Sequence, residues 1–183
     1  MTESYKPNQS QLFDDAAAQR FLQTHANDEV EPPLYIPTGI FLQSFQFVNA
    51  TEVNITGYIW QRYTKGIHDD LSRGFVLPEA VNSGDNIKAK QAYKRISGKT
   101  EVIGWYFEST LRQSFDYSKY PLDHKTLKIR LWHKDFNRNV ILVPDCGAYV
   151  STGPKDAFGF DERIELGGWF IDDDLLRLPN PKL

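Results

Sequence analysis

The fold class is decided by residues 39–63, which read GIFLQSFQFVNATEVNITGYIWQRY. Apolar and polar side chains alternate in two runs, 39–47 and 52–63, and the turn-forming residues Asn49-Ala50-Thr51 stand between them. Alternation with a period of two places successive side chains on opposite faces of a β-strand. Two such runs joined by a short polar turn predict a β-hairpin.

The same alternation assigns a face to each side chain. In the first run, Phe41, Phe45 and Phe47 fall on one face, and Ile40 and Leu42 on the other. In the second run, one face is apolar, with Val53, Ile55 and Ile59. The opposite face carries Asn54, Thr56, Tyr58, Trp60 and Arg62.

Further strands are predicted in the second half of the chain. The run 101–115 places Ile103, Trp105, Phe107 and Leu111 on one face. Three more strands are expected at 124–132 (HKTLKIRLW), 140–143 (VILV) and 164–171 (IELGGWFI), and a shorter one within 74–81, stopped by Pro78. Aromatic residues make up 14% of the chain and suit sheets. Recurring strands without helices between them predict an all-β fold, an antiparallel immunoglobulin-like β-sandwich.

The N-terminal part has a different pattern. Residues 12–25 have helical spacing, with Phe13, Ala17 and Phe21 on one stripe. The proline-containing stretch EVEPPLYIP at 29–37 cannot continue a helix. We expect residues 1–35 to form an arm with a short helix and a proline linker, and residues 36–183 to form the sandwich domain.

Composition excludes several classes of protein. The formal net charge of −3 argues against a nucleic-acid partner, and the single cysteine, Cys146, excludes an internal disulfide. No apolar run has the length of a membrane span. The basic stretch Lys88–Lys99 carries five positive charges without an acid. It has no clean period, and it suits either a solvated face or contact with an anionic partner.

Few residues suggest chemistry. Asp172, Asp173 and Asp174 offer carboxylate oxygens to a hard cation such as Ca²⁺, although such a run is more often a solvated loop. The four histidines are scattered, and the catalytic and nucleotide-binding motifs with known mechanics do not occur. No cofactor is implied, and we expect no enzyme.

One segment is more specific: SFDYSKYPLDHKTLKIRLWHKD, residues 114–135. At its centre, Tyr120-Pro121-Leu122-Asp123 forms a turn between two alternating runs. The segment resembles the signature loop of the pentameric ligand-gated ion channels, the Cys-loop receptor superfamily. In animal members two cysteines enclose thirteen residues. The matching positions here are Gln113 and Leu127, so the resemblance is to the bacterial members, which lack the disulfide.

The resemblance extends along the chain in the same order. Residues 36–63 are similar to the family's first two strands, with Trp60-Gln61-Arg62 at its Trp-x-Asp-x-Arg position. Val76-Leu77-Pro78-Glu79 resembles its Trp-x-Pro-Asp element, and Gly167-Gly168-Trp169 the Gly-Trp of bacterial members. In all, residues 36–63 and 101–171 take part.

The resemblance implies a ligand-sensing domain on the extracellular or periplasmic side of a membrane protein, assembled as a pentamer, with small molecules bound between subunits. The ligand-binding positions would be Trp60, Arg62, Trp105, Phe107, Trp132 and His133, and the Tyr120–Asp123 turn would transmit the signal. The membrane domain is expected to lie outside this chain, and the isolated domain to associate weakly. Two alternatives remain: a stand-alone periplasmic sensor or interaction module that reuses the fold, and a hydrolase with two catalytic carboxylates.

Overall fold

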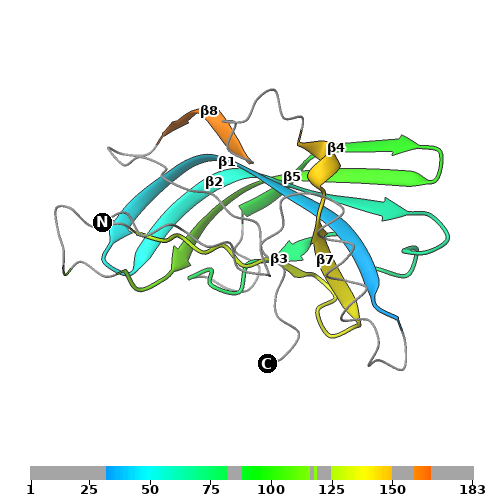
Figure 1. Cartoon of the computed structure of the whole chain (residues 1–183), viewed down its shortest axis with the longest axis horizontal. Coiled ribbons are helices and arrows are strands. Elements are labelled where there is room, and N and C mark those ends of the chain that lie inside the picture. Colours follow the sequence, from blue (N-terminus) through cyan, green and yellow to red (C-terminus); the bar gives the residue numbers. More distant parts are fainter. Residues whose placement is uncertain (1–31, 82–87, 116–117, 119–124, 150–158, 166–183) are drawn as a thin grey trace, which may run out of the picture.

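The computed structural model describes residues 32–81, 88–115, 118, 125–149 and 159–165 (Figure 1). The helix predicted at 12–25, the Tyr120–Asp123 turn, Gly167-Gly168-Trp169 and the run Asp172–Asp174 lie outside these residues. Within the described ranges the chain is all-β, and its helical content is the three-residue 3-10 helix η2, Cys146–Ala148.

The predicted hairpin is confirmed. Strand β1, Leu34–Asn49, pairs antiparallel with β2, Glu52–Thr64. The Asn49 side chain shapes the turn between them, since its Oδ1 accepts a hydrogen bond from the Thr51 backbone N–H at 2.8 Å. Val53, Ile55 and Ile59 are 0% exposed, as their shared face predicts.

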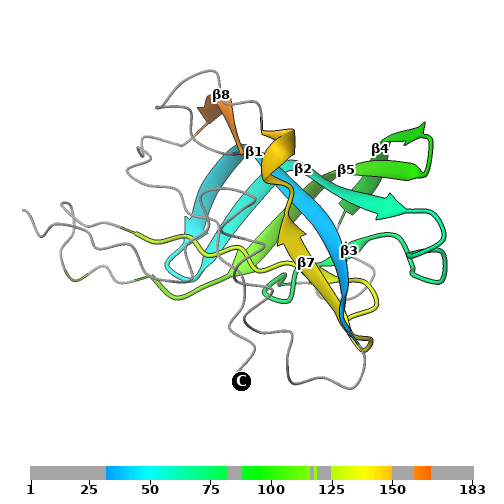
Figure 2. The same cartoon turned by 45° about the vertical axis from the view of Figure 1, so that its right-hand side comes forward.

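The hairpin lies at the centre of a larger sheet with the order β4-β5-β2-β1-β7. Its other strands are β4 (Lys88–Ser97), β5 (Thr100–Arg112) and β7 (Val140–Pro144), and β8 (Phe160–Glu165) also pairs with β1. Figures 1 and 2 show β1, β2 and β5 bending together as one curved sheet. Pairing is antiparallel from β4 to β1, but β7 and β8 run parallel to β1, so the antiparallel prediction is wrong there. Residues 125–131, which come between β5 and β7, lie on the concave side of the sheet and pack on its core through Leu127, Ile129 and Leu131.

A second, smaller layer covers that concave side. Strands β3 (Phe75–Val76) and β6 (Trp132–His133) pair antiparallel. Of the strand predicted at 124–132, residues 125–131 are not a strand and Trp132 is. The preceding segment, 125–131, keeps the alternating pattern, with Leu127, Ile129 and Leu131 packed on the core. Alternation reports which side chains are buried, whereas a strand also requires a backbone partner.

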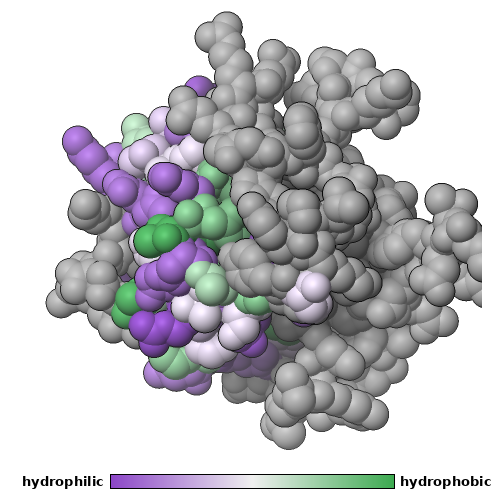
Figure 3. Space-filling view, turned by 90° about the vertical axis from the view of Figure 1, so that its left-hand side faces the viewer, coloured by the Kyte–Doolittle hydropathy of each residue, from purple (hydrophilic) through white to green (hydrophobic). Residues whose placement is uncertain are grey.

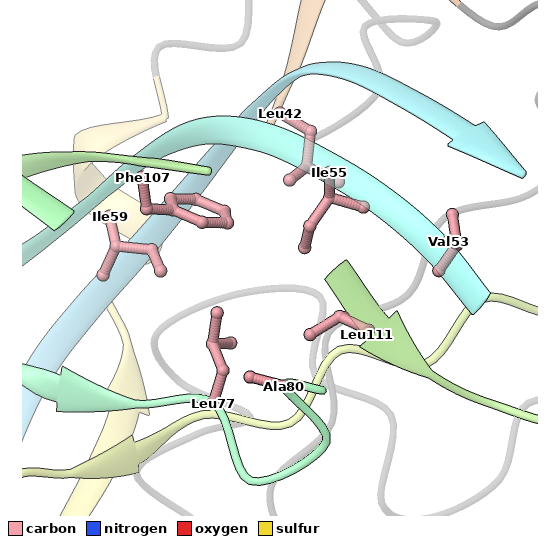
Figure 4. Packing of buried hydrophobic residues seen from close by; sticks show 8 residues of the cluster. All are labelled: Leu42, Val53, Ile55, Ile59, Leu77, Ala80, Phe107 and Leu111. Atoms are coloured by element: carbon pink, nitrogen blue, oxygen red, sulfur yellow. The ribbon is translucent and has the colours of Figure 1, made fainter. Parts of the chain in front are cut away.

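The core lies between the two layers. Figure 4 shows side chains of β1, β2 and β5 pointing toward Leu77 and Ala80, which follow β3. The members of this cluster are Leu42, Val53, Ile55, Ile59, Leu77, Ala80, Phe107 and Leu111. A second cluster contains Ile36, Tyr63, Leu71, Ile103 and Trp105.

A β-bulge changes the faces of β1. The register with β2 shifts between Leu42 and Ser44, so that Gln43 is an additional residue. Phe45 and Phe47 therefore pack on the same core cluster as Ile40 and Leu42. The prediction that placed those two phenylalanines opposite Ile40 and Leu42 is wrong, because one inserted residue reverses every later side chain.

The chain before and after the hairpin is also better defined than the sequence indicates. Strand β1 begins at Leu34, inside the expected linker, because Leu34 to Thr38 pair with β7. The basic stretch becomes β4, an exposed strand at the edge of the sheet. Lysines on an edge strand oppose pairing with another chain.

Candidate functional site

Aromatic rings gather on the face of the sheet that points away from the core. Trp60 pairs with Gly39 on one side and with Gly104 on the other, and Tyr93 of β4 pairs with Gly104. A Cβ atom at Gly39 would lie 2.0 Å from the Trp60 ring, and one at Gly104 2.2 Å from the Tyr93 ring. The two glycines thus allow these rings to lie directly over the backbone of the neighbouring strand.

Two more tyrosines extend this surface. Tyr58 and Tyr106 are cross-strand partners whose ring centroids are 5.5 Å apart in an edge-to-face arrangement. Tyr58, Trp60, Tyr93 and Tyr106 together form what is here called the outer aromatic face. Tyr93 is 36% exposed, and the Arg95 guanidinium lies 5.6 Å from its ring centroid. Such a surface offers ring faces to a cation or to a flat apolar group.

A buried carboxylate anchors one side of the outer aromatic face. Oδ2 of Asp145, which follows β7, accepts hydrogen bonds from Trp60 Nε1 at 3.1 Å and from Arg62 at 2.9 Å. The Asp145 side chain is 10% exposed and that of Arg62 40%, so the arginine is held by the carboxylate while part of it reaches solvent. Arg62 therefore offers a fixed positive charge beside the rings.

Tyr149 closes the opposite side of Trp60. The two ring centroids are 5.3 Å apart, and the Tyr149 hydroxyl donates to the Ile40 carbonyl at 2.9 Å. Burial raises the pKa of Tyr149 to about 12, so the hydroxyl keeps its proton. Trp60 is thus fixed in orientation by Asp145, Gly39 and Tyr149.

Trp105 and Phe107 lie on the other side of the same sheet. Trp105 is 9% exposed and Phe107 0%, and both pack against Phe75 in the core. The residue of β5 that faces the same way as Trp60 is Tyr106. Strand β5 therefore does contribute to the outer aromatic face, but through Tyr106 and not through Trp105 or Phe107. Because Trp60 pairs with Gly104, the residue two positions further along β5, Tyr106, faces the same side.

Trp132 and His133 lie next to each other on β6 but point in opposite directions. Trp132 is 45% exposed, and its ring lies 5.8 Å from that of Phe136. Beside them is a hollow of about 290 Å³ between β6 and β7. It is lined by Leu131, Trp132, His133, Phe136, Val140, Ile141 and Leu142. Trp132 belongs to this apolar hollow and not to the outer aromatic face.

His133 belongs to a buried polar network. Its Nδ1 accepts from the Asp135 N–H at 3.1 Å, so the proton of the neutral ring is assigned to Nε2, 3.2 Å from the Tyr63 hydroxyl. That hydroxyl donates to Gln61 Oε1 at 2.6 Å. Burial raises the pKa of Tyr63 to about 12 and lowers that of His133. These groups are neutral, and among the described residues the Nε2 of Gln61 is buried without a hydrogen-bond partner.

Charged groups beside this network are also paired. The Arg73 guanidinium lies 4.1 Å from the Tyr63 ring centroid and 2.8 Å from Glu101, which Lys94 also contacts at 2.6 Å. The hydrogen bond from Lys94 holds the pKa of Glu101 below its usual range. A general-acid carboxyl needs a raised pKa, so Glu101 does not suit that role.

Within the described ranges, no group of three His, Cys, Asp or Glu side chains is placed to hold a metal ion. In the same residues, no helix is long and apolar enough to cross a membrane. Comparison of the sequence with known protein families and with curated proteins finds no match.

Proposed function

We propose that this chain is a ligand-sensing domain similar to the extracellular domain of a bacterial pentameric ligand-gated ion channel, with an immunoglobulin-like sandwich fold. It would act on the extracellular or periplasmic side of a membrane protein and would not be an enzyme. The observation that carries the proposal is the outer aromatic face around the fixed Arg62 side chain. It is centred on β2, the strand whose Trp60-Gln61-Arg62 resembles the family motif, and it extends over β5 and β4 through Tyr106 and Tyr93.

The two candidate surfaces fit a site between copies of the chain. Trp60 and Arg62 lie on the outer face, whereas Trp132 projects from β6 beside a separate apolar hollow. One copy would contribute Trp132, and its neighbour the outer aromatic face. The ligand class that this chemistry suits is a small amine or carboxylate, with the amine over the ring faces and a carboxylate toward Arg62.

The test combines ligand titration with measurement of assembly. Small amines and carboxylates are titrated into the chain by calorimetry, and sedimentation velocity is recorded with and without them. We expect weak binding that increases self-association, because a ligand held between copies stabilises the assembled state. Arg62→Gln and Trp132→Ala should each weaken binding, whereas Arg112→Gln, on an exposed side chain near Glu52, should not.

A mixing experiment locates the site. In a mixture of the Arg62→Gln and Trp132→Ala variants, some interfaces combine an intact Arg62 with an intact Trp132, so part of the binding should return. Binding by monomers without any change in association would favour the stand-alone sensor. Full binding by the Trp132→Ala variant, or no binding and no change in association, would overturn the proposal.

A further inference from the structure

Gln113 joins two segments that are distant in the sequence. It follows the last residue of β5, and its side-chain Nε2 donates to the Thr126 carbonyl at 2.8 Å. Its Oε1 accepts from the Lys128 backbone N–H at 3.1 Å. A carbonyl can only accept and an N–H can only donate, so these two partners fix which way the amide faces.

The two bonds have the pattern of a sheet ladder. A residue in a parallel pair donates to the carbonyl before its partner and accepts from the N–H after it. The Gln113 side chain does the same around Leu127, although it is not backbone. At Leu127 a side chain thus supplies the pairing that a neighbouring strand would otherwise supply.

Gln113 and Leu127 are also held in place by other contacts. The Gln113 backbone N–H donates to the Thr51 carbonyl in the β1–β2 turn at 2.8 Å, and Leu127 packs on the core. One residue earlier, the Arg112 N–H donates to the Glu79 carbonyl at 2.8 Å, and the Glu79 carboxylate pairs with Arg130. Figure 1 shows the β1–β2 turn beside the end of β5, and Figure 3 views this side of the molecule, where hydrophilic and hydrophobic residues are interspersed.

We propose that Gln113 is a non-covalent clasp that holds together the two ends of the segment 114–126. Thirteen residues lie between Gln113 and Leu127, and no cysteine stands at either position. Two exchangeable hydrogen bonds close the segment, so closure is reversible under any redox condition. That the clasp is a positioning residue for signal transmission rests on the proposed function, whereas the clasp itself can be tested without a ligand.

The experiment measures backbone amide exchange by NMR on the full chain. Gln113→Met keeps the length of the side chain and removes both hydrogen bonds. We expect the Lys128 amide to exchange about fivefold faster, the factor that corresponds to one lost hydrogen bond. The amides of Ile55 and Ile59 should exchange at the wild-type rate. Ser114→Ala, at the next exposed position, is the matched control and should change neither.

A second variant separates the two bonds. In Gln113→Glu the carboxylate still accepts from Lys128 but no longer donates to Thr126. Protection at Lys128 should persist while the carbonyl ¹³C shift of Thr126 moves. A Lys128 exchange rate within twofold of wild type in Gln113→Met would overturn the clasp. An equal increase at Ile55 and Ile59 would also overturn it, because Gln113 would then support the whole fold. Neither result depends on ligand binding.

Discussion

Phe107 and Tyr106 are neighbours on β5 that face opposite sides of the sheet, and their replacement by alanine distinguishes core from surface. Phe107 is 0% exposed and lies between β2 residues and Leu77 (Figure 4). Its ring also makes an edge-to-face contact with Phe75 at 6.1 Å. Tyr106 is half-buried and contacts Tyr58 on the outer aromatic face.

The expected cost of Phe107→Ala has three parts. Loss of apolar burial contributes about 2 kcal/mol, the cavity left behind about 1–2 kcal/mol, and the lost aromatic contact about 0.5–1 kcal/mol. The total is about 4 kcal/mol of the free energy of unfolding. Tyr106→Ala loses one ring contact and some strand preference, and should cost about 1 kcal/mol.

Urea unfolding followed by tryptophan fluorescence measures both values, and equal slopes would show that the same unfolding reaction is compared. A cost below about 1.5 kcal/mol for Phe107→Ala, or equal costs for the two variants, would refute the placement of the core. It would also return Phe107 to the set of surface residues able to meet a ligand.

Two predictions concern the buried polar network. Burial lowers the pKa of His133 and also that of His68, whose ring packs edge-to-face against Tyr63. The unfolded chain therefore binds protons that the folded chain does not. The free energy of unfolding should therefore decrease as the pH falls below about 6.5, and His133→Gln should make this dependence on pH weaker. A urea concentration at the unfolding midpoint that stays constant between pH 7 and 5 would contradict this prediction. Tyr63→Phe leaves Gln61 and His133 without their shared hydroxyl and should lower the free energy of unfolding by about 1–3 kcal/mol. Tyr106→Phe, the control, should lower it by less than about 0.5 kcal/mol, with both values measured by urea unfolding. Equal losses would show that the hydroxyl of Tyr63 is not needed.

The proposed site was only partly accessible to sequence reasoning. Alternation correctly places Trp60 and Arg62 on one face of β2. Their partners, Asp145 and Tyr149, come from a segment more than eighty residues away and form no motif with them. The position of Tyr93 on the outer aromatic face depends on a further irregularity, because the register of β4 with β5 shifts between Gln91 and Tyr93.

The sequence by itself determined the all-β class, the central hairpin and the buried faces of β2 and β5, because strict alternation leaves only one way to bury the apolar side chains. Only the tertiary structure decided the faces of Phe45 and Phe47, since the bulge at Gln43 leaves no sign in the alternation itself. The same is true of the parallel pairing of β1 with β7 and of the contacts made by Gln113 and Asp145. These features arise between distant segments, where the packing of one layer on another selects partners that no local pattern encodes.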